Sequence, residues 1–167
     1  KKKEPNIPSQ RTEPPSQKKP GVLSIALIII LGLTVYVNSL NGQFIWDDEY
    51  LIEKNEHIKH WSYLQQIFIK DIGAGAGHPY VFYRPLQMAT YMVDYSLWKL
   101  NVNGYHLTNI LLHVSVALGI YWLIYIIFEN NFLSLLTGLL FVVHPIHTEA
   151  VTYISGRADP LALLFML

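Results

Sequence analysis

The sequence predicts an all-α integral membrane protein, a multi-span helical bundle with interfacial helices in its first outer loop. Hydrophobic residues make up 51% of the chain and charged residues only 14%, whereas charge is nearer a quarter of a typical soluble domain. Residues 22–40 and 105–128 form uncharged apolar runs, long enough at about 1.5 Å per residue to cross a hydrocarbon core of about 30 Å. The ionisable residues gather between these runs, so the connecting segments are expected to carry any chemistry.

The first segment, residues 1–21, is predicted to be a disordered basic tail. Residues 1–20 are rich in Pro, Gln, Ser and Lys and have few apolar side chains to offset the entropy cost of ordering. Its basic residues outnumber the acidic Glu4 and Glu13, so the positive-inside rule keeps the tail in the cytoplasm. Residues 22–40 then form the first predicted transmembrane helix. A cleaved signal peptide is the alternative, but the apolar run is longer than usual and lacks a small-residue cleavage site.

Residues 41–104 are predicted to form the outer or luminal loop, because acidic and aromatic residues alternate there, as is typical of the membrane interface. Within this loop, residues 85–100 are ambiguous, since the segment is apolar but short and carries Asp94 and Lys99. A membrane-crossing helix of this length would be at the short limit, whereas a helix lying flat on the outer face tolerates a polar stripe. We favour the flat helix, and both alternatives stay open at this point.

With a flat helix there, the chain returns to the cytoplasm through residues 105–128. Asn103 and Gly104 are predicted to form the turn before this second span. Residues 132–155 form the third span with its outer polar end, and residues 158–167 begin a fourth helix, for which Asp159 and Pro160 provide a typical cap and first turn. The chain stops inside this apolar run, so we expect it to be a piece of a longer protein.

Ionisable side chains gather at the ends of the apolar segments that this topology places outside. Because such groups are costly against lipid, they are expected to face a cavity, to pair with one another or to do chemistry. The candidates are Asp47 and Asp48 after the first run, Arg84 before the flat helix, His144, His147 and Glu149 after the third run, and Arg157 and Asp159 before the fourth. Their convergence on one membrane face predicts a functional site.

Each charged candidate allows a chemical and a structural interpretation. Asp47 or Asp48 could act as a general base that takes a proton from an attacking alcohol, or the pair could simply cap the next helix and face water. Arg84 presents a planar fork of donors that suits a phosphate, or it reaches out to lipid headgroups. Arg157 and Asp159 could form only a local ion pair.

The histidines allow a metal site as one interpretation. His144 and His147 lie close together with Glu149 behind them, which could place imidazole and carboxylate ligands on a divalent metal. Pro145 bends the geometry between them, so a hydrogen-bonded helix end is the simpler interpretation. A divalent metal is therefore one option, and no cofactor is assigned. The chain has no cysteine, which excludes thiolate metal sites and disulfides.

Several strings resemble the membrane half of the transmembrane and tetratricopeptide-repeat O-mannosyltransferase family, which belongs with the polyprenyl-phosphate-sugar-dependent glycosyltransferases of the GT-C fold. The strings are NGQFIWDD at residues 41–48, YRPL at 83–86, GYHLTN at 104–109 together with His113, HPIHTEAV at 144–151 and SGRAD at 155–159. The resemblance covers roughly residues 22–167.

This resemblance implies a GT-C-like fold, of which the chain holds the N-terminal part, and a role for each candidate residue. It implies that Asp47 or Asp48 is the catalytic base, that Arg84 binds the lipid phosphate, with Arg157 as a second candidate contact, and that Asp159 is an acidic site residue. His144, His147 and Glu149 are expected to have supporting roles. Tetratricopeptide repeats, of about 34 residues each, are absent from this chain, so we expect it to be inactive alone.

The expected function is inverting transfer of a sugar, with mannose as the candidate, from a polyprenyl-phosphate carrier to a protein hydroxyl. The expected partners are that donor, a protein acceptor and the lipid bilayer, with no nucleic acid. The site is expected on the outer or luminal face of the endoplasmic reticulum or of a prokaryotic plasma membrane. The alternative is a non-catalytic membrane anchor or scaffold subunit of a larger assembly. A transporter is disfavoured, because only His113 stands well inside a span.

Overall fold

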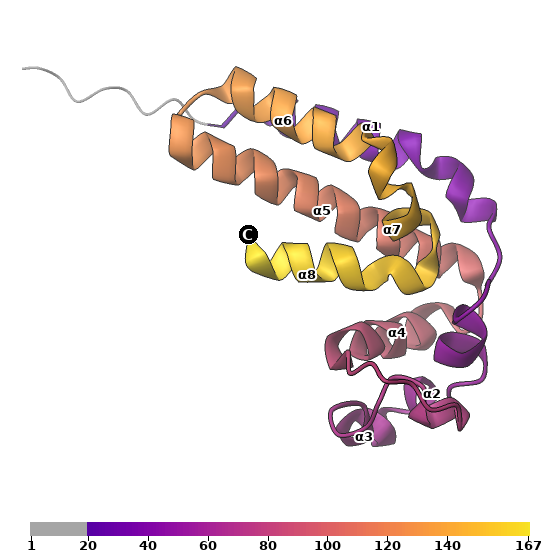
Figure 1. The fold of residues 1–167 in the computed structure, drawn as a ribbon. Helices are drawn as coiled ribbons and strands as arrows, with labels where there is room; N and C mark the ends of the chain where they lie inside the picture. The colour runs from indigo at the N-terminus through magenta and orange to yellow at the C-terminus, as the bar shows by residue number, and fades with distance from the viewer. Residues whose placement is uncertain (1–19) are drawn as a thin grey trace, which may run out of the picture.

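The computed structural model describes residues 20–167, and all regular secondary structure there is helical (Figure 1). The predicted all-α class is therefore confirmed, while nearly all of the predicted tail lies outside the described residues. The α-helices are α1 (Val22–Val35), α2 (Glu56–Lys59), α3 (Leu64–Ile67), α4 (Pro85–Trp98), α5 (Val102–Phe128), α6 (Asn131–Val143), α7 (Thr148–Thr152) and α8 (Ala158–Met166). Shorter helical turns are η1 (Val37–Asn41), η2 (Glu49–Glu53), η3 (Trp61–Tyr63), η4 (Ala74–Ala76), η5 (Pro145–His147) and η6 (Ile154–Arg157).

Two segments of the described chain, Val22–Asn41 and Val102–Phe128, are long and apolar enough to cross a membrane. A third candidate is the pair Asn131–Val143 and Pro145–Thr152, whose two halves meet at an angle of 47°. Proline lacks an N–H group and disfavours helical geometry in the residue before it, so the break falls at His144–Pro145. Residues 20–167 therefore contain two candidate spans, or three if the bent pair is one span.

The helices α1, α5 and α6 lie side by side and form the apolar bundle (Figure 1). Small residues line their contacts: a Cβ added at Gly32 would lie 2.6 Å from Val114 Cγ2, and one added at Gly138 would lie 2.8 Å from Ile28 Cδ1. Small residues let neighbouring helices approach closely in a membrane, where apolar side chains gain little from leaving lipid. The bundle thus depends on close packing at these glycines.

Polar contacts join the three helices at one end of this bundle. Asn131 Oδ1 at the start of α6 accepts hydrogen bonds from the Tyr121 hydroxyl of α5 at 2.6 Å and from the Gly21 amide before α1 at 3.1 Å. The neighbouring Asn130 side chain accepts from the amides of Phe132 and Leu133, which caps α6. The turn between α5 and α6 is therefore also the point that ties α1 to both helices.

The helices α2, α3 and α4 form a separate lobe beside one end of the bundle (Figure 1). Its interior contains Ile52, Ile58, Tyr91 and Met92, all completely buried. Asn55 caps α2 by accepting from the His57 amide at 3.1 Å. The segment predicted as an outer loop is therefore a folded unit, whose core also includes Tyr105 of α5 and Ile154 of η6.

The ambiguous segment at residues 85–100 contains α4, which has 14 residues and extends about 21 Å at 1.5 Å per residue. This length does not reach across a hydrocarbon core of about 30 Å, and α4 is not one of the candidate spans. Asp94 is buried rather than part of a solvent-facing stripe. The spanning alternative therefore loses its support, while the flat placement on the membrane surface stays a prediction.

Candidate functional site

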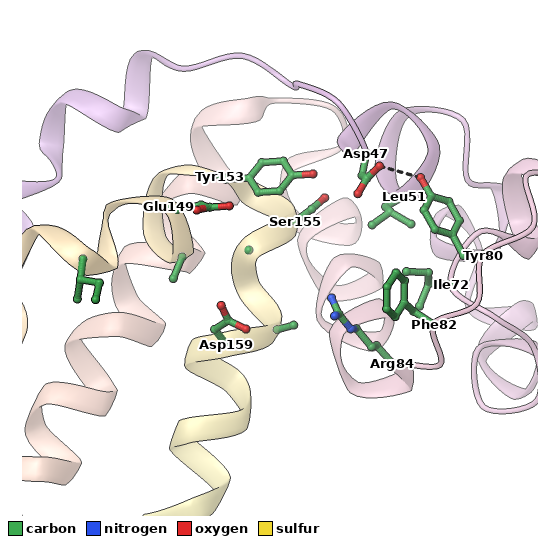
Figure 2. A pocket seen from close by; sticks show the side chains of 14 residues that line it. Asp47, Leu51, Ile72, Tyr80, Phe82, Arg84, Glu149, Tyr153, Ser155 and Asp159 are labelled. Atoms are coloured by element: carbon green, nitrogen blue, oxygen red, sulfur yellow. Dashed lines mark hydrogen bonds between the residues drawn. The ribbon is translucent and has the colours of Figure 1, made fainter.

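A cavity of about 370 Å³ opens where the lobe meets the second half of the bent pair and the segment that follows it (Figure 2). Its walls come from three separate stretches of the chain, within residues 47–51, 72–84 and 146–159. Of the residues singled out in the sequence, the cavity is lined by Asp47, Arg84, Glu149 and Asp159. Asp48, His144, His147 and Arg157 are not part of this lining.

Asp47 presents an exposed carboxylate to the cavity. The Tyr80 hydroxyl donates a hydrogen bond to Asp47 Oδ1 at 3.0 Å (Figure 2). Burial, reinforced by this carboxylate, raises the pKa of Tyr80 to about 12, so the phenol keeps its proton at physiological pH and remains a donor. Trp46, immediately before Asp47, has a left-handed φ of 52°, which is uncommon for a bulky residue and is found most often at functional sites.

Asp48 has a different environment from its neighbour, because it is completely buried. Its carboxylate accepts hydrogen bonds from the Ser155 hydroxyl at 2.5 Å, from the Ser155 amide at 3.0 Å and from the Ile45 amide at 3.1 Å. Burial raises the pKa of Asp48 above its ordinary value, although these hydrogen bonds act in the opposite direction. The simple interpretation that both acids face water is therefore wrong for Asp48.

Arg84 stands at the start of α4, with its guanidinium 4.9 Å from the centre of the Phe82 ring. Figure 2 shows Arg84 on one side of the cavity and Asp159 on the other. Within residues 20–167 Arg84 forms no ion pair, and it is the one basic residue among those that line the cavity. Its cation is therefore available for an anionic ligand.

A second cavity, of about 470 Å³, adjoins the first and shares Arg84, Ala158 and Asp159 with it. The remaining lining is mostly apolar and comes from the start of α4 and one face of α8: Pro85, Leu86, Gln87, Leu161, Ala162 and Phe165. Asp159 lies in the first turn of α8 without a side-chain capping hydrogen bond, so the predicted capping role is wrong. Arg84 and Asp159 thus lie where a polar cavity adjoins a mostly apolar one.

His144 and His147 lie outside the cavity. The His147 ring lies 4.3 Å from Phe141 and 5.2 Å from His113, so it faces the bundle. His144 Nδ1 accepts from the Ile146 amide at 3.2 Å and so caps the turn at Pro145. In the part of the chain that the structure describes, no three His, Asp or Glu side chains are grouped so that they could hold a metal.

Arg157 is completely buried below the cavity wall, and its Nη1 lies 2.6 Å from Asp94 Oδ2. The expected local pair with Asp159 is therefore wrong. Asp94 was not among the predicted site residues, although a carboxylate in an otherwise apolar helix is a signal for a buried partner. Tyr80 and Ser155 were also missed. Ser155 begins the SGRAD string at 155–159, whereas no motif or spacing in the sequence marks Tyr80.

Comparison with known proteins gives several relatives, although no family model and no solved structure matches the chain. The chain is 31% identical over 166 residues to the protein O-mannosyl-transferase F38B6.6 of Caenorhabditis elegans, which covers 96% of the chain and 24% of that relative. It is 36% identical over 140 residues to human protein O-mannosyl-transferase TMTC2, covering 82% of the chain and 17% of the relative. Human protein O-mannosyl-transferase TMTC1 is 39% identical over 148 residues, or 85% of the chain and 17% of the relative. The chain thus spans about a quarter or less of the length of these relatives.

Proposed function

We propose a function from one premise: over most of its length this chain is homologous to the TMTC-type protein O-mannosyl-transferases. The resemblance predicted from the sequence is thereby confirmed. The chain is proposed to form part of a membrane glycosyltransferase that transfers mannose to a protein hydroxyl. The names of these relatives support the sugar and the acceptor class, and the candidate spans of this chain support the membrane setting.

The donor is proposed to be mannose carried on a polyprenyl phosphate. One observation carries this proposal: a single cavity holds both a carboxylate, Asp47, and an unpaired cation, Arg84. A sugar linked to a phosphate needs a cation at its leaving group, and a neutral hydroxyl needs an acceptor for its proton. The adjoining cavity, whose lining is mostly apolar, suits the lipid part of such a donor.

In the proposed reaction the Asp47 carboxylate accepts the proton of the acceptor hydroxyl while that oxygen bonds to the anomeric carbon of the sugar. The bond between the anomeric carbon and the phosphate oxygen breaks, and its electron pair leaves with the phosphate. Because the hydroxyl attacks from the face opposite the phosphate, the configuration of the anomeric carbon is inverted. Arg84 stabilises the charge that develops on the phosphate. The Tyr80 hydroxyl orients Asp47 through its hydrogen bond.

The remaining candidates receive roles that follow from their positions. Glu149 and Asp159 line the same cavity and are proposed to accept hydrogen bonds from sugar or acceptor hydroxyls. His144 and His147 support the site indirectly, because they hold the bent turn that leads into it. We assign the phosphate contact to Arg84 alone, since the Arg157 guanidinium is buried and paired. The cavity is proposed to face the outer or luminal side of the membrane, with the N-terminus in the cytoplasm. The fold is proposed to be of the GT-C type.

The experiment that tests this function uses the full-length protein, purified in detergent and supplied with polyprenyl-phosphate mannose and acceptor protein. Arg84→Gln should lower kcat/KM by about 100-fold, the scale for removing one donor to a developing negative charge. Lys70→Gln is the matched control, because Lys70 is an exposed cation of the same lobe that does not line the cavity. Undiminished turnover of Arg84→Gln removes Arg84 from the site, and a wild-type protein that transfers no sugar favours the scaffold alternative.

A further inference from the structure

One wall of the candidate cavity is formed by residues 153–156, most of which belong to the helical turn η6. The backbone of this segment is held by side chains from α4 and α5. Asn109 Nδ2 donates to the carbonyl groups of Tyr153 at 3.2 Å and Ile154 at 3.4 Å. The Tyr91 hydroxyl also donates to the Ile154 carbonyl, at 3.0 Å, and Gln87 Nε2 donates to the Ser155 carbonyl at 2.9 Å. Buried backbone groups need such partners, so the position of this wall depends on the position of those side chains.

Arg157 ends this segment and connects it to the same two helices. Its Nε donates to Asn109 Oδ1 at 2.6 Å, and its Nη2 donates to the Tyr105 carbonyl at 3.1 Å. Its Nη1 forms the ion pair with Asp94 at 2.6 Å. The other carboxylate oxygen of Asp94 accepts from the Thr108 hydroxyl at 2.7 Å. The Arg157 guanidinium therefore orients the Asn109 side-chain amide, which holds the wall. The buried Asp94 carboxylate in turn orients Arg157.

The burial of this pair makes it a poor source of stability. The side chains of Arg157 and Asp94 are 0% and 3% exposed, so both charges have lost their hydration. An ion pair that is buried to this extent is often no more stabilising than apolar residues of similar size. The pair instead fixes the orientation of the Arg157 side chain, because a planar guanidinium binds its partners in a defined geometry.

We propose that Asp94 and Arg157 are positioning residues, a buried pair that sets the location of the 153–156 wall opposite Asp47 and Arg84. The proposal rests on the proposed transferase function for its effect on turnover. It assigns Arg157 no contact with the donor. A guanidinium that is completely buried and hydrogen-bonded on three of its nitrogens is not open to a phosphate in the cavity.

The test compares Asp94→Asn, Arg157→Lys and the double variant in the full-length protein, with turnover expressed per folded molecule. We expect each single variant to lower kcat at least tenfold while the donor Kd stays within twofold of wild type. The double variant should lose no more than the worse single one, because coupled residues act as a unit. Glu56→Gln, which breaks the exposed pair of Glu56 and Lys59, is the matched control and should leave kcat unchanged.

Other outcomes overturn the proposal. A raised donor Kd in Arg157→Lys but not in Asp94→Asn indicates direct phosphate binding by Arg157. A lowered melting temperature with unchanged kcat per folded molecule in both variants indicates a purely structural pair. If Asp94→Asn does not fold, Thr108→Val removes only the hydroxyl bound to Asp94, and kcat should fall two- to fivefold with an unchanged donor Kd. An unchanged kcat in that variant contradicts the proposal.

A readout independent of turnover separates this proposal from the proposed function. Hydrogen exchange of the amides in residues 153–157 should accelerate at least tenfold in Asp94→Asn and stay unchanged in Glu56→Gln. If the wild-type protein transfers no sugar, the transferase function fails, while the exchange result still tests whether the pair positions the wall. Unchanged exchange there in a folded Asp94→Asn protein overturns the positioning role whatever the turnover.

Discussion

Asp47 and Asp48 are neighbours in the chain, yet their carboxylates lie in opposite environments. Asp47 lines the cavity and accepts a hydrogen bond from Tyr80, whereas Asp48 is completely buried and accepts two from Ser155. Ser155 itself lines the cavity. We propose that the acidic pair divides two tasks, with Asp47 serving the chemistry and Asp48 attaching the lobe to the wall.

Asp48→Asn is expected to destabilise the protein. The amide that replaces the carboxylate has one acceptor oxygen, so it cannot serve both Ser155 and the Ile45 amide, and a buried donor loses its partner. We expect a loss of about 1–3 kcal/mol in the free energy of unfolding, measured as a lower melting temperature in detergent. Glu49→Gln, in an exposed pair of the same segment, should melt like wild type. Equal melting of the two variants contradicts the attachment role.

The pH dependence of stability gives a second test of Asp48. Because burial raises the pKa of Asp48 in the folded state, the folded protein holds this proton more tightly than the unfolded chain, whose Asp pKa is about 3.9. The contribution to stability is then greatest below the unfolded pKa and is lost as the pH rises through the raised folded pKa. The melting-temperature difference between wild type and Asp48→Asn should therefore shrink as the pH rises from about 3.5. A difference that stays constant or widens would count against this account.

Tyr80→Phe should lower turnover while leaving stability nearly unchanged. The variant removes the hydroxyl that holds Asp47, in an exposed contact that contributes little to folding. We expect kcat to fall about fivefold to tenfold, which corresponds to the roughly 1–1.4 kcal/mol of one typical hydrogen bond. Tyr83→Phe is the matched control, since its exposed hydroxyl donates to the Phe68 carbonyl outside the cavity. Similar turnover of both variants would remove Tyr80 from the site.

Gly32→Ala should loosen the apolar bundle. The added Cβ would lie 2.6 Å from Val114 Cγ2 and 2.8 Å from Val142 Cγ2, on two different helices. We expect this overpacking to cost about 1–3 kcal/mol, seen as a lower melting temperature of the detergent-solubilised protein. Gly119→Ala meets only the end of the flexible Leu167 side chain, at 3.0 Å, and should melt close to wild type. An unaffected Gly32→Ala would mean that the three helices are not packed as described.

The sequence predicts the apolar helices well, because burial in lipid requires long uncharged runs that are visible without tertiary information. Its error at Asn103–Gly104 has a local cause. The Asn101 side chain caps α5 by accepting from the Asn103 amide, so a pair that is typical of turns lies inside the helix. The bend at His144–Pro145 follows from proline chemistry, but its angle depends on packing against α5 and α8.

The site is less predictable, because its geometry depends on contacts between distant segments. The convergence of Asp47, Arg84 and Asp159 on one cavity follows from their places at the ends of apolar runs. Which of two adjacent acids faces that cavity depends on the backbone at Trp46 and on Ser155, more than a hundred residues later. Asp94 in an otherwise apolar helix signals a buried partner, but no local pattern identifies that partner as Arg157.

The central claim is that Asp47 is the base of a transferase site. Its most direct test is single-turnover transfer of mannose from polyprenyl-phosphate mannose by full-length Asp47→Asn, at equal amounts of folded protein and saturating donor. We expect the rate to fall by about 100-fold or more, the scale of a lost general base, while donor binding is retained and Glu49→Gln keeps the wild-type rate. A transfer rate for Asp47→Asn within about twofold of wild type would contradict the account, because losing a general base lowers the rate by far more than that.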